Sequence, residues 1–293
     1  MLSIKNLGMA LCIFMMTSQS QAQHPAPLPS ELVTSKEVIW ARTDFAPYFI
    51  LKGDYQNKGI SDQVILYFSK NIEDFKHHSV AMSLKRMLKN ARSGVAICHV
   101  ALLKNPERET FIDYSIPIMR SYPNGIITTT TGLYKLGLTP DNIKPIQLTD
   151  LLGKNLTISV HDGRSYSPYI DKIIKQEQHK TNSIFQMKTG LKEHERLVLM
   201  ITNNRIDGLI ARPEEVQFIN IEQKLEETLY FVEIQDSSST DISYVGCSKG
   251  PWNKALLTKI NQLIEQDKDL SKTINDTHKD WLPTHLHDSH ILK

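Results

Sequence analysis

Short apolar runs and helical apolar repeats alternate along the chain. An apolar run bounded by turn residues predicts a buried strand, and apolar residues spaced three and four apart predict a helix. The first strand is predicted at 38–41, and the first helix begins at Gly59-Ile60-Ser61-Asp62, with Ser61 as its cap. Further strands are predicted at 79–82, 95–100, 125–131, 156–160, 206–211, 229–234 and 242–247. Further helices are predicted at 83–92, 191–203 and 252–265, with a short helical turn at 148–154, and Gly163-Arg164-Ser165 leads into a helix that ends near Gln178. A second short helix and Trp281 complete the core.

This alternation indicates an α/β fold, in which helices cover a parallel or mixed sheet. It stops and restarts near 117–122 and near 235–241. Two such breaks indicate a chain that leaves one lobe, builds a second and returns by a second crossing. The first lobe is therefore expected to be discontinuous, with parts at 37–118 and 239–284, and the second lobe is expected at 119–238.

The first residues have the pattern of an export signal. Lys5 precedes an apolar run at 7–16, and Ser20-Gln21-Ala22 has the small-x-small form that a signal peptidase reads. The run is too short to span a bilayer, so a signal peptide at 1–22, cut after Ala22, is favoured over the alternative of an N-terminal anchor. A flexible lead-in follows at 23–36. The expected location is the periplasm or exterior of a bacterium.

Composition narrows the function classes only slightly. The 293 residues carry 34 Lys and Arg against 32 Asp and Glu, and 40% of them are hydrophobic. These values are typical of a globular protein and argue against a disordered chain. A formal charge of +2 gives no electrostatic reason to expect a nucleic acid as partner.

Common catalytic and metal motifs are missing from the sequence. Neither phosphate-binding glycine motif occurs, and 163–167 lacks the second glycine of a nucleophile elbow. Val198 stands where a zinc-protease helix needs its second histidine. No cofactor is therefore expected. A tail at 285–293 contains His285, His287 and His290, which are more typical of a solvated terminus than of a metal site.

Two loops contain residue types that suit a small ligand. Asp44-Phe45-Ala46-Pro47-Tyr48-Phe49 follows a predicted strand directly, where α/β folds place ligands, and its aromatic faces can form an apolar wall. The alternative is that Phe45 and Phe49 are core residues and only Tyr48 is exposed. In the second loop, Arg108 offers a fork of donors suited to a carboxylate, whereas its flanking Glu107 and Glu109 could instead form an ordinary surface ion pair.

The order of these motifs resembles the family 3 periplasmic solute-binding proteins, which have the type II two-lobed binding fold. In particular, it is similar to a branch with a D-F-P-P-Y/F-F opening and an L-L-K-T-P-E-R-E loop, matched here by 44–49 and 102–109. Further matching motifs are Gly59-Ile60-Ser61-Asp62, Phe111-x-x-Tyr114-Ser115-x-Pro117, Gly163-Arg164-Ser165-Tyr166 and Arg205-x-Asp207. The resemblance covers nearly all of 36–283 and implies two hinge crossings between the lobes.

The resemblance also implies a ligand site. In amino-acid-binding members, the arginine that Arg108 matches grips the α-carboxylate of the ligand. The second lobe of such members contributes backbone N–H groups and a hydroxyl at a helix N-terminus, which Gly163, Arg164 and Ser165 match. A helix N-terminus favours an anion.

Two departures from the family pattern change the expected ligand. Ala101 and Leu103 replace the small hydroxyl residues that assist the loop arginine. Arg212 stands where the family has the acidic residue that takes the ammonium of the ligand. Because an arginine cannot serve an ammonium, a more anionic or non-amino ligand is expected, with Leu103 and Arg212 in the site.

Cys98 and Cys247 are the two cysteines of the expected mature chain, and in an oxidising compartment such a pair is a candidate disulfide. The alternative is two buried thiols in separate strands. The family topology favours the bridge, because it makes the third strand of lobe 1 and the returning strand neighbours. Closing a loop of about 150 residues would contribute roughly 4–5 kcal/mol in the chain-entropy model.

The expected function is that of a monomeric periplasmic protein that binds a small polar, anionic solute between two lobes and delivers it to a membrane permease or sensor. Two alternatives stay open. One is an enzyme on the same fold, such as a dehydratase, because a fold does not determine function. The other is a ligandless structural or signalling partner.

Overall fold

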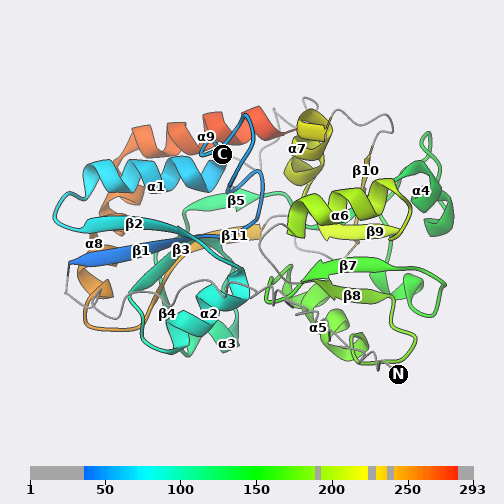
Figure 1. Cartoon of the computed structure of the whole chain (residues 1–293), viewed down its shortest axis with the longest axis horizontal. Coiled ribbons are helices and arrows are strands. Elements are labelled where there is room, and N and C mark those ends of the chain that lie inside the picture. Colours follow the sequence, from blue (N-terminus) through cyan, green and yellow to red (C-terminus); the bar gives the residue numbers. More distant parts are fainter. Residues whose placement is uncertain (1–35, 189–192, 224–228, 236–240, 283–293) are drawn as a thin grey trace, which may run out of the picture. The chain divides into compact units, whose positions relative to one another are not determined.

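A computed structural model describes residues 36–188, 193–223, 229–235 and 241–282 (Figure 1). All of them belong to one unit of the chain, Leu32–Lys293. The predicted signal peptide at 1–22 and the histidines of the predicted tail lie outside the described residues.

The first sheet has the strand order β2-β1-β3-β11-β4, and β5 pairs with β11. Its strands are β1 (Glu37–Arg42), β2 (Lys76–Ala81), β3 (Ile97–Leu102), β4 (Ile112–Tyr114), β5 (Met119–Ser121) and β11 (Asp241–Ser248). β1 runs parallel to β2 and β3, whereas β11 runs antiparallel to β3 and β4. The four central residues of β1 are buried, which explains its continuous apolar run.

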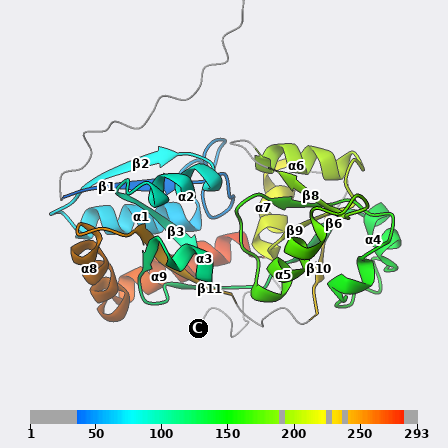
Figure 2. The same cartoon turned by 90° about the horizontal axis from the view of Figure 1, so that it is seen from below.

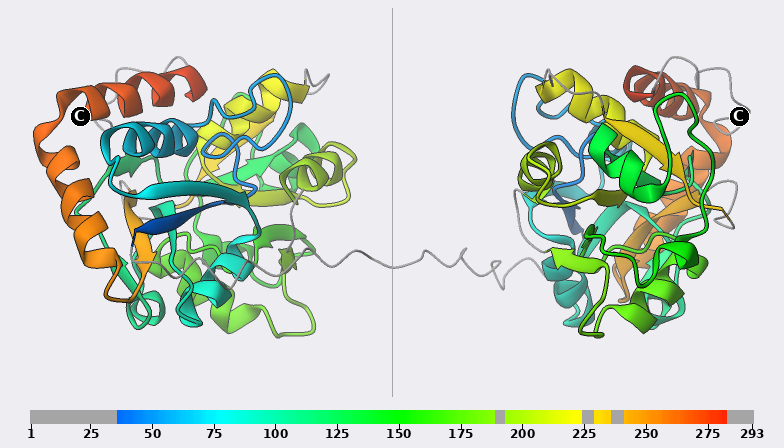
Figure 3. Two further views of the ribbon diagram at one scale, coloured as in Figure 1. Left: turned by 60° about the vertical axis from the view of Figure 1, so that its left-hand side comes forward. Right: turned by 90° about the vertical axis from the view of Figure 1, so that its right-hand side faces the viewer.

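Helices cover both sides of this first sheet. They are α1 (Ile60–Asn71), α2 (Leu84–Arg92), α3 (Pro106–Glu109), α8 (Asn253–Gln266) and α9 (Lys268–Trp281). α1 and α9 lie together on one side of the strands and α2 lies on the other (Figures 1 and 3). Trp40, Phe68 and Trp281 are buried in one core between these elements, so the predicted role of Trp281 is confirmed.

The second sheet has the order β10-β6-β9-β7-β8. Its strands are β6 (Gly125–Thr128), β7 (Ile158–His161), β8 (Phe185–Lys188), β9 (Gly208–Ala211) and β10 (Tyr230–Glu233). Its helices are α4 (Thr130–Leu136), the 3-10 helix η1 (Leu148–Leu151), α5 (Pro168–Glu177), α6 (Glu193–Thr202) and α7 (Pro213–Gln223). β7 pairs parallel with β8 and β9, and β6 pairs antiparallel with β9 and β10.

The strands of the first sheet thus come from both ends of the described chain, and those of the second sheet from its middle. We call the first sheet with its helices lobe 1 and the second sheet with its helices lobe 2. The predicted two-lobed α/β fold with a discontinuous first lobe is confirmed.

Cys98 and Cys247 form a disulfide. The two residues are direct cross-strand partners in β3 and β11, and both are fully buried. The bridge therefore joins the strand that precedes lobe 2 to the strand that follows it, and the alternative of two separate buried thiols is wrong.

The predicted cap of α1 and the predicted start of α5 are wrong, because local hydrogen bonds favour other residues. Gly59, not Ser61, caps α1: the Asp62 carboxylate accepts the Gly59 N–H at 3.2 Å, and Ser61 is buried. A side chain at Gly59 would collide with the backbone of Tyr48, since an added Cβ would lie 2.5 Å from its carbonyl oxygen. α5 begins at Pro168, because proline suits the first turn and Ser167 accepts the Ile170 N–H.

Other elements are longer or shorter than the sequence pattern predicts. The strand predicted at 125–131 ends at Thr128, because Thr129 caps α4 by accepting the Gly132 N–H. α9 has 14 residues, as many as α8, and is not short. The elements absent from the sequence prediction are β4, β5, β8, α3, α4 and α7.

Candidate functional site

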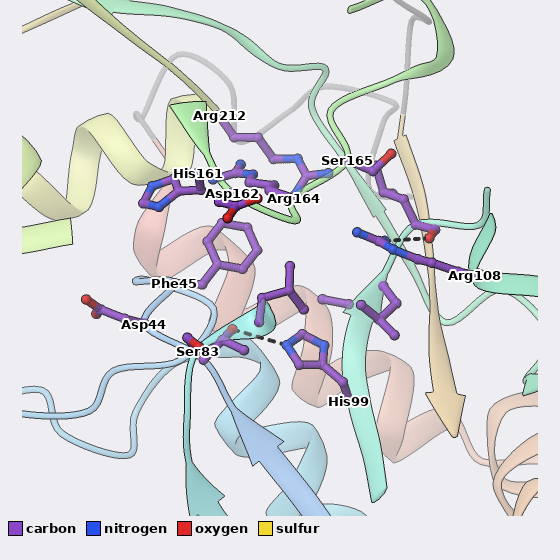
Figure 4. Close-up of a pocket in the computed structure, with 15 residues that line it drawn as sticks. Asp44, Phe45, Ser83, His99, Arg108, His161, Asp162, Arg164, Ser165 and Arg212 are labelled. Carbon is purple, nitrogen blue, oxygen red and sulfur yellow. Dashed lines mark hydrogen bonds between the residues drawn. The ribbon is translucent and has the colours of Figure 1, made fainter. Parts of the chain in front are cut away.

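A cavity of about 70 Å³ lies where the two lobes meet (Figure 4). Lobe 1 lines it with Thr43, Asp44, Phe45, Ser83, Leu84, His99, Ala101, Leu102, Leu103 and Arg108, and lobe 2 with His161, Asp162, Arg164, Ser165 and Arg212. Many of these residues end or directly follow β1, β3, β7 or β9. Parallel strands of both sheets therefore point their carboxyl ends at the cavity, the usual ligand position in α/β folds.

The structure brings together seven of the nine residues predicted for a ligand site. They are Asp44, Phe45, Leu103, Arg108, Arg164, Ser165 and Arg212. Tyr48 and Phe49 are not among the lining residues, and both are fully buried. The alternative, that Phe45 and Phe49 are core residues and only Tyr48 is exposed, is right for Phe49 and wrong for Tyr48.

Tyr48 and Phe49 support the cavity wall from behind. The Tyr48 ring stacks on Phe45 with centroids 4.5 Å apart, and Phe49 packs edge-on against His99 at 5.0 Å. The Tyr48 hydroxyl donates to Ser121 at 3.0 Å. Burial raises the pKa of Tyr48 well above its ordinary value, so this hydroxyl stays protonated. Phe45 is the aromatic residue of this loop that reaches the cavity.

Arg108 is a buried cation whose hydrogen-bond partners are neutral. α3 holds it in place, because the Asn105 side chain accepts the Arg108 N–H at 2.9 Å. Its guanidinium donates to the carbonyl oxygens of Leu103 at 2.8 Å and Gly163 at 2.7 Å. Glu107 pairs with Arg92 instead, and no carboxylate within the described ranges forms an ion pair with Arg108. Burial lowers the pKa of Arg108, but a guanidinium starts high enough to stay charged.

Arg164, by contrast, is neutralised inside the protein. It donates to both carboxylate oxygens of Glu215, at 2.6 and 3.0 Å, and to Asn124 at 3.1 Å. Its guanidinium lies 4.3 Å from the centre of the Phe45 ring, so it holds this aromatic wall in place from the other lobe. Nε of Arg212 donates to the Tyr122 carbonyl at 3.2 Å.

Ser165 lies before the helix start rather than in the first turn. Its hydroxyl donates to Asp171, which also accepts the Tyr166 N–H at 2.8 Å. Gly163 adopts φ +81°, a conformation that favours glycine, and presents its carbonyl to Arg108. The expected helix N-terminus at Gly163 to Ser165 is therefore a loop, and its backbone acceptor faces lobe 1.

Direct contacts join the lobes around the cavity. The bond from Arg108 to the Gly163 carbonyl is buried, and Lys85 pairs with Asp162 at 2.7 Å on the exposed side. Behind the cavity, His278 of α9 contacts Glu214 of α7 at 2.8 Å, and both side chains are fully buried. These two buried contacts and this exposed ion pair thus join the two lobes.

His99 is a cavity residue that the sequence reasoning missed. One ring nitrogen, Nε2, lies 3.1 Å from the Thr43 hydroxyl, and the side chain is 2% exposed. Burial, with a smaller contribution from the Arg108 charge, lowers the pKa of His99 to about 3, so the ring is neutral at physiological pH. The sequence does contain an indication of this role, because His99 is the polar residue in the otherwise apolar strand ICHVAL.

This histidine should make stability fall in mild acid. Between about pH 6.5 and pH 3 the unfolded chain binds a proton at residue 99 that the folded chain does not. The free energy of unfolding is therefore undiminished above pH 6.5 and decreases as the pH falls below it. The loss can reach about 1.4 kcal/mol per pH unit. Urea unfolding of wild type and His99→Gln from pH 7 to pH 4 measures it, and a flatter dependence is expected for the variant. Equal slopes would show that this ring does not carry the effect.

The described residues contain no group of three or more His, Cys, Asp or Glu side chains placed to hold a metal ion. None of the described helices has the length and apolar character that crossing a bilayer requires.

No family model matches this sequence, and no curated protein matches it either. Solved structures, however, share its fold. A histidine kinase sensor domain with similarity to periplasmic binding proteins superposes with a TM-score of 0.63 at 13% identity, over 84% of this chain and 96% of that chain. The chain therefore has the two-lobed fold of periplasmic binding proteins.

Two further structures extend the comparison. The amino acid ABC transporter substrate-binding protein AbpA from Streptococcus pneumoniae, bound to L-arginine, has a TM-score of 0.61 at 19% identity, over 85% of this chain and 97% of that chain. The periplasmic domain of BvgS from B. pertussis has a TM-score of 0.60 at 19% identity, over 83% of this chain and 43% of that chain. Neighbours of this fold thus include both transporter and sensor proteins.

Proposed function

We propose that this protein binds a small anionic solute in the cavity between its lobes, as a periplasmic binding protein of the family 3 type. The observation that carries the proposal is the pairing of Arg108: a buried guanidinium at the cavity has only neutral carbonyl partners among the described residues. Burying a charge costs several kcal/mol unless an opposite charge compensates it. A carboxylate would compensate it and would form stronger, charge-assisted bonds with the same fork.

The other lining residues favour a small anionic group. Arg164 already has a carboxylate partner in Glu215. A ligand anion would therefore gain more electrostatic free energy at Arg108 than at Arg164. The volume of about 70 Å³ is roughly half that of a cavity that holds benzene. Phe45, Leu102 and Leu103 supply apolar walls. The group enclosed is therefore the size of a carboxylate with one or two carbon atoms.

The proposed location is the periplasm, reached with a signal peptide cut after Ala22. A disulfide such as Cys98–Cys247 persists in oxidising compartments, which supports export. Because structural neighbours include a transporter binding protein and sensor domains, the proposed partner is a membrane permease or a sensor kinase. In either case the proposed role is binding and release rather than catalysis.

A thermal-shift panel of matched pairs tests this function. Each small carboxylate, such as acetate, propionate or lactate, is compared with its neutral amide of nearly the same shape. At about 100 times its Kd a ligand adds roughly 2.7 kcal/mol to folding, which corresponds to a rise of about 5–10 °C in the unfolding temperature. At least one acid is expected to raise the temperature while its amide does not. Shifts with amides, sugars or neutral peptides alone would contradict the anionic ligand.

A further inference from the structure

A second hollow adjoins the cavity on the side of α3 and α5. This outer groove has a volume of about 600 Å³ and shares Leu103 and Ser165 with the lining of the cavity. Lobe 1 contributes Lys104 and Tyr244 to it. α5 of lobe 2 runs along this edge, on the same side of the molecule as α3 (Figure 2). The small cavity and the larger groove are thus adjacent compartments between the same two lobes.

Unpaired positive charge collects in the outer groove from both lobes. Lys104 holds its ammonium 4.1 Å from the ring centre of Tyr244 and 5.4 Å from that of Tyr114. Lys172 and Lys175 lie three residues apart on the exposed side of α5, and both line the groove. None of these three lysines forms an ion pair with another described residue.

Asp171, the acidic residue of the outer groove, forms no ion pair with these lysines within the described ranges. Both oxygens of Asp171 accept hydrogen bonds within the protein, from the Ser165 hydroxyl and from the Tyr166 N–H. Unpaired cations on two sides of a hollow attract a negative charge into it. The volume of about 600 Å³ lies within the usual range for small-molecule sites, whereas the inner cavity lies far below it.

We propose that the ligand is an elongated dianion whose first carboxylate is held at Arg108 in the inner cavity and whose second negative group lies in the outer groove among Lys104, Lys172 and Lys175. This inference rests on the proposed function, because it assigns the head group to the same cavity. The lobe 2 lysines make the outer groove a subsite that selects for the second charge. Tyr244 supplies the apolar wall along which the carbon chain lies.

Calorimetric titration with two homologous series tests this subsite. Dicarboxylates from succinate to suberate are compared with monocarboxylates of equal carbon number. At one or more lengths the dicarboxylate is expected to bind about tenfold tighter, since two exposed charge contacts together are worth about that factor. The advantage should shrink when salt is added, because exposed charges are screened.

A double variant separates the subsite from the head-group site. Lys172→Ala with Lys175→Ala should remove most of the tenfold advantage and leave the affinity for the monocarboxylate unchanged. Lys144→Ala, an exposed lysine of lobe 2 outside both hollows, should change neither affinity. If monocarboxylates bind and no dicarboxylate binds more tightly, or if the double variant keeps the advantage, the subsite is wrong and the proposed function stands. If no carboxylate binds at all, both are wrong.

Discussion

Loss of the Cys98–Cys247 disulfide is expected to lower the free energy of unfolding by about 4–5 kcal/mol. The two cysteines are 149 positions apart, and the closed loop contains all of lobe 2, so the bridge removes a large part of the freedom of the unfolded chain. Replacing both residues with alanine leaves no free thiol among the described residues, and the lost side-chain volume is small. For a chain of this size the unfolding temperature should fall by roughly 10–15 °C.

Urea unfolding followed by tryptophan fluorescence measures this loss. The wild type treated with a thiol reductant serves as the control, because it should match the double alanine variant, whereas the reductant should not affect the variant itself. A double variant as stable as the oxidised wild type would mean that native-state strain cancels the entropic gain, in conflict with the expectation.

Replacing Arg108 with methionine is expected to weaken carboxylate binding by about 100-fold or more. Two charge-assisted hydrogen bonds contribute about 1.5–3 kcal/mol each, and every 1.4 kcal/mol is a factor of ten in Kd. Arg108→Lys, which keeps the charge and loses the fork, should fall between the wild type and Arg108→Met. The measurement is calorimetry with the carboxylate that raises the unfolding temperature most.

Arg196→Met is the matched control for the Arg108 variants. Arg196 is an exposed arginine of α6 and does not line the cavity, so its removal should leave Kd unchanged. Circular dichroism of each variant checks that the loss of the Leu103 and Gly163 contacts has not unfolded the protein. A folded Arg108→Met protein with wild-type affinity would remove Arg108 from the ligand site.

The sequence predicts the fold well where one side of an element is apolar and fails where buried positions are polar. β1 and α1 follow their apolar patterns, but α7 does not, because its first turn buries two consecutive glutamates. Glu215 pairs with Arg164 and Glu214 with His278. Neighbouring helical residues point about 100° apart, so each glutamate meets a different partner from a different lobe. Such tertiary pairing leaves no periodic signal in a single sequence.

The candidate site shows the same limit. Motif order brought Arg108, Arg164, Ser165 and Arg212 into one site, and the structure places all of them on the cavity. The order of motifs could not show which aromatic residue of the loop after β1 faces the cavity, because that depends on how Tyr48 packs beneath Phe45. The loop at Gly163 presents a carbonyl to Arg108, whereas the family resemblance implied N–H groups there.

The central claim is that a small carboxylate enters the cavity between the lobes because its charge compensates Arg108. Calorimetric titration of the wild-type protein with one matched pair, the best carboxylate of the panel and its amide, tests this most directly. We expect the carboxylate to bind and the amide to bind at least about 100-fold more weakly, since the amide cannot form the charge-assisted pair. Equal binding of acid and amide, or heat from neither, would contradict the claim.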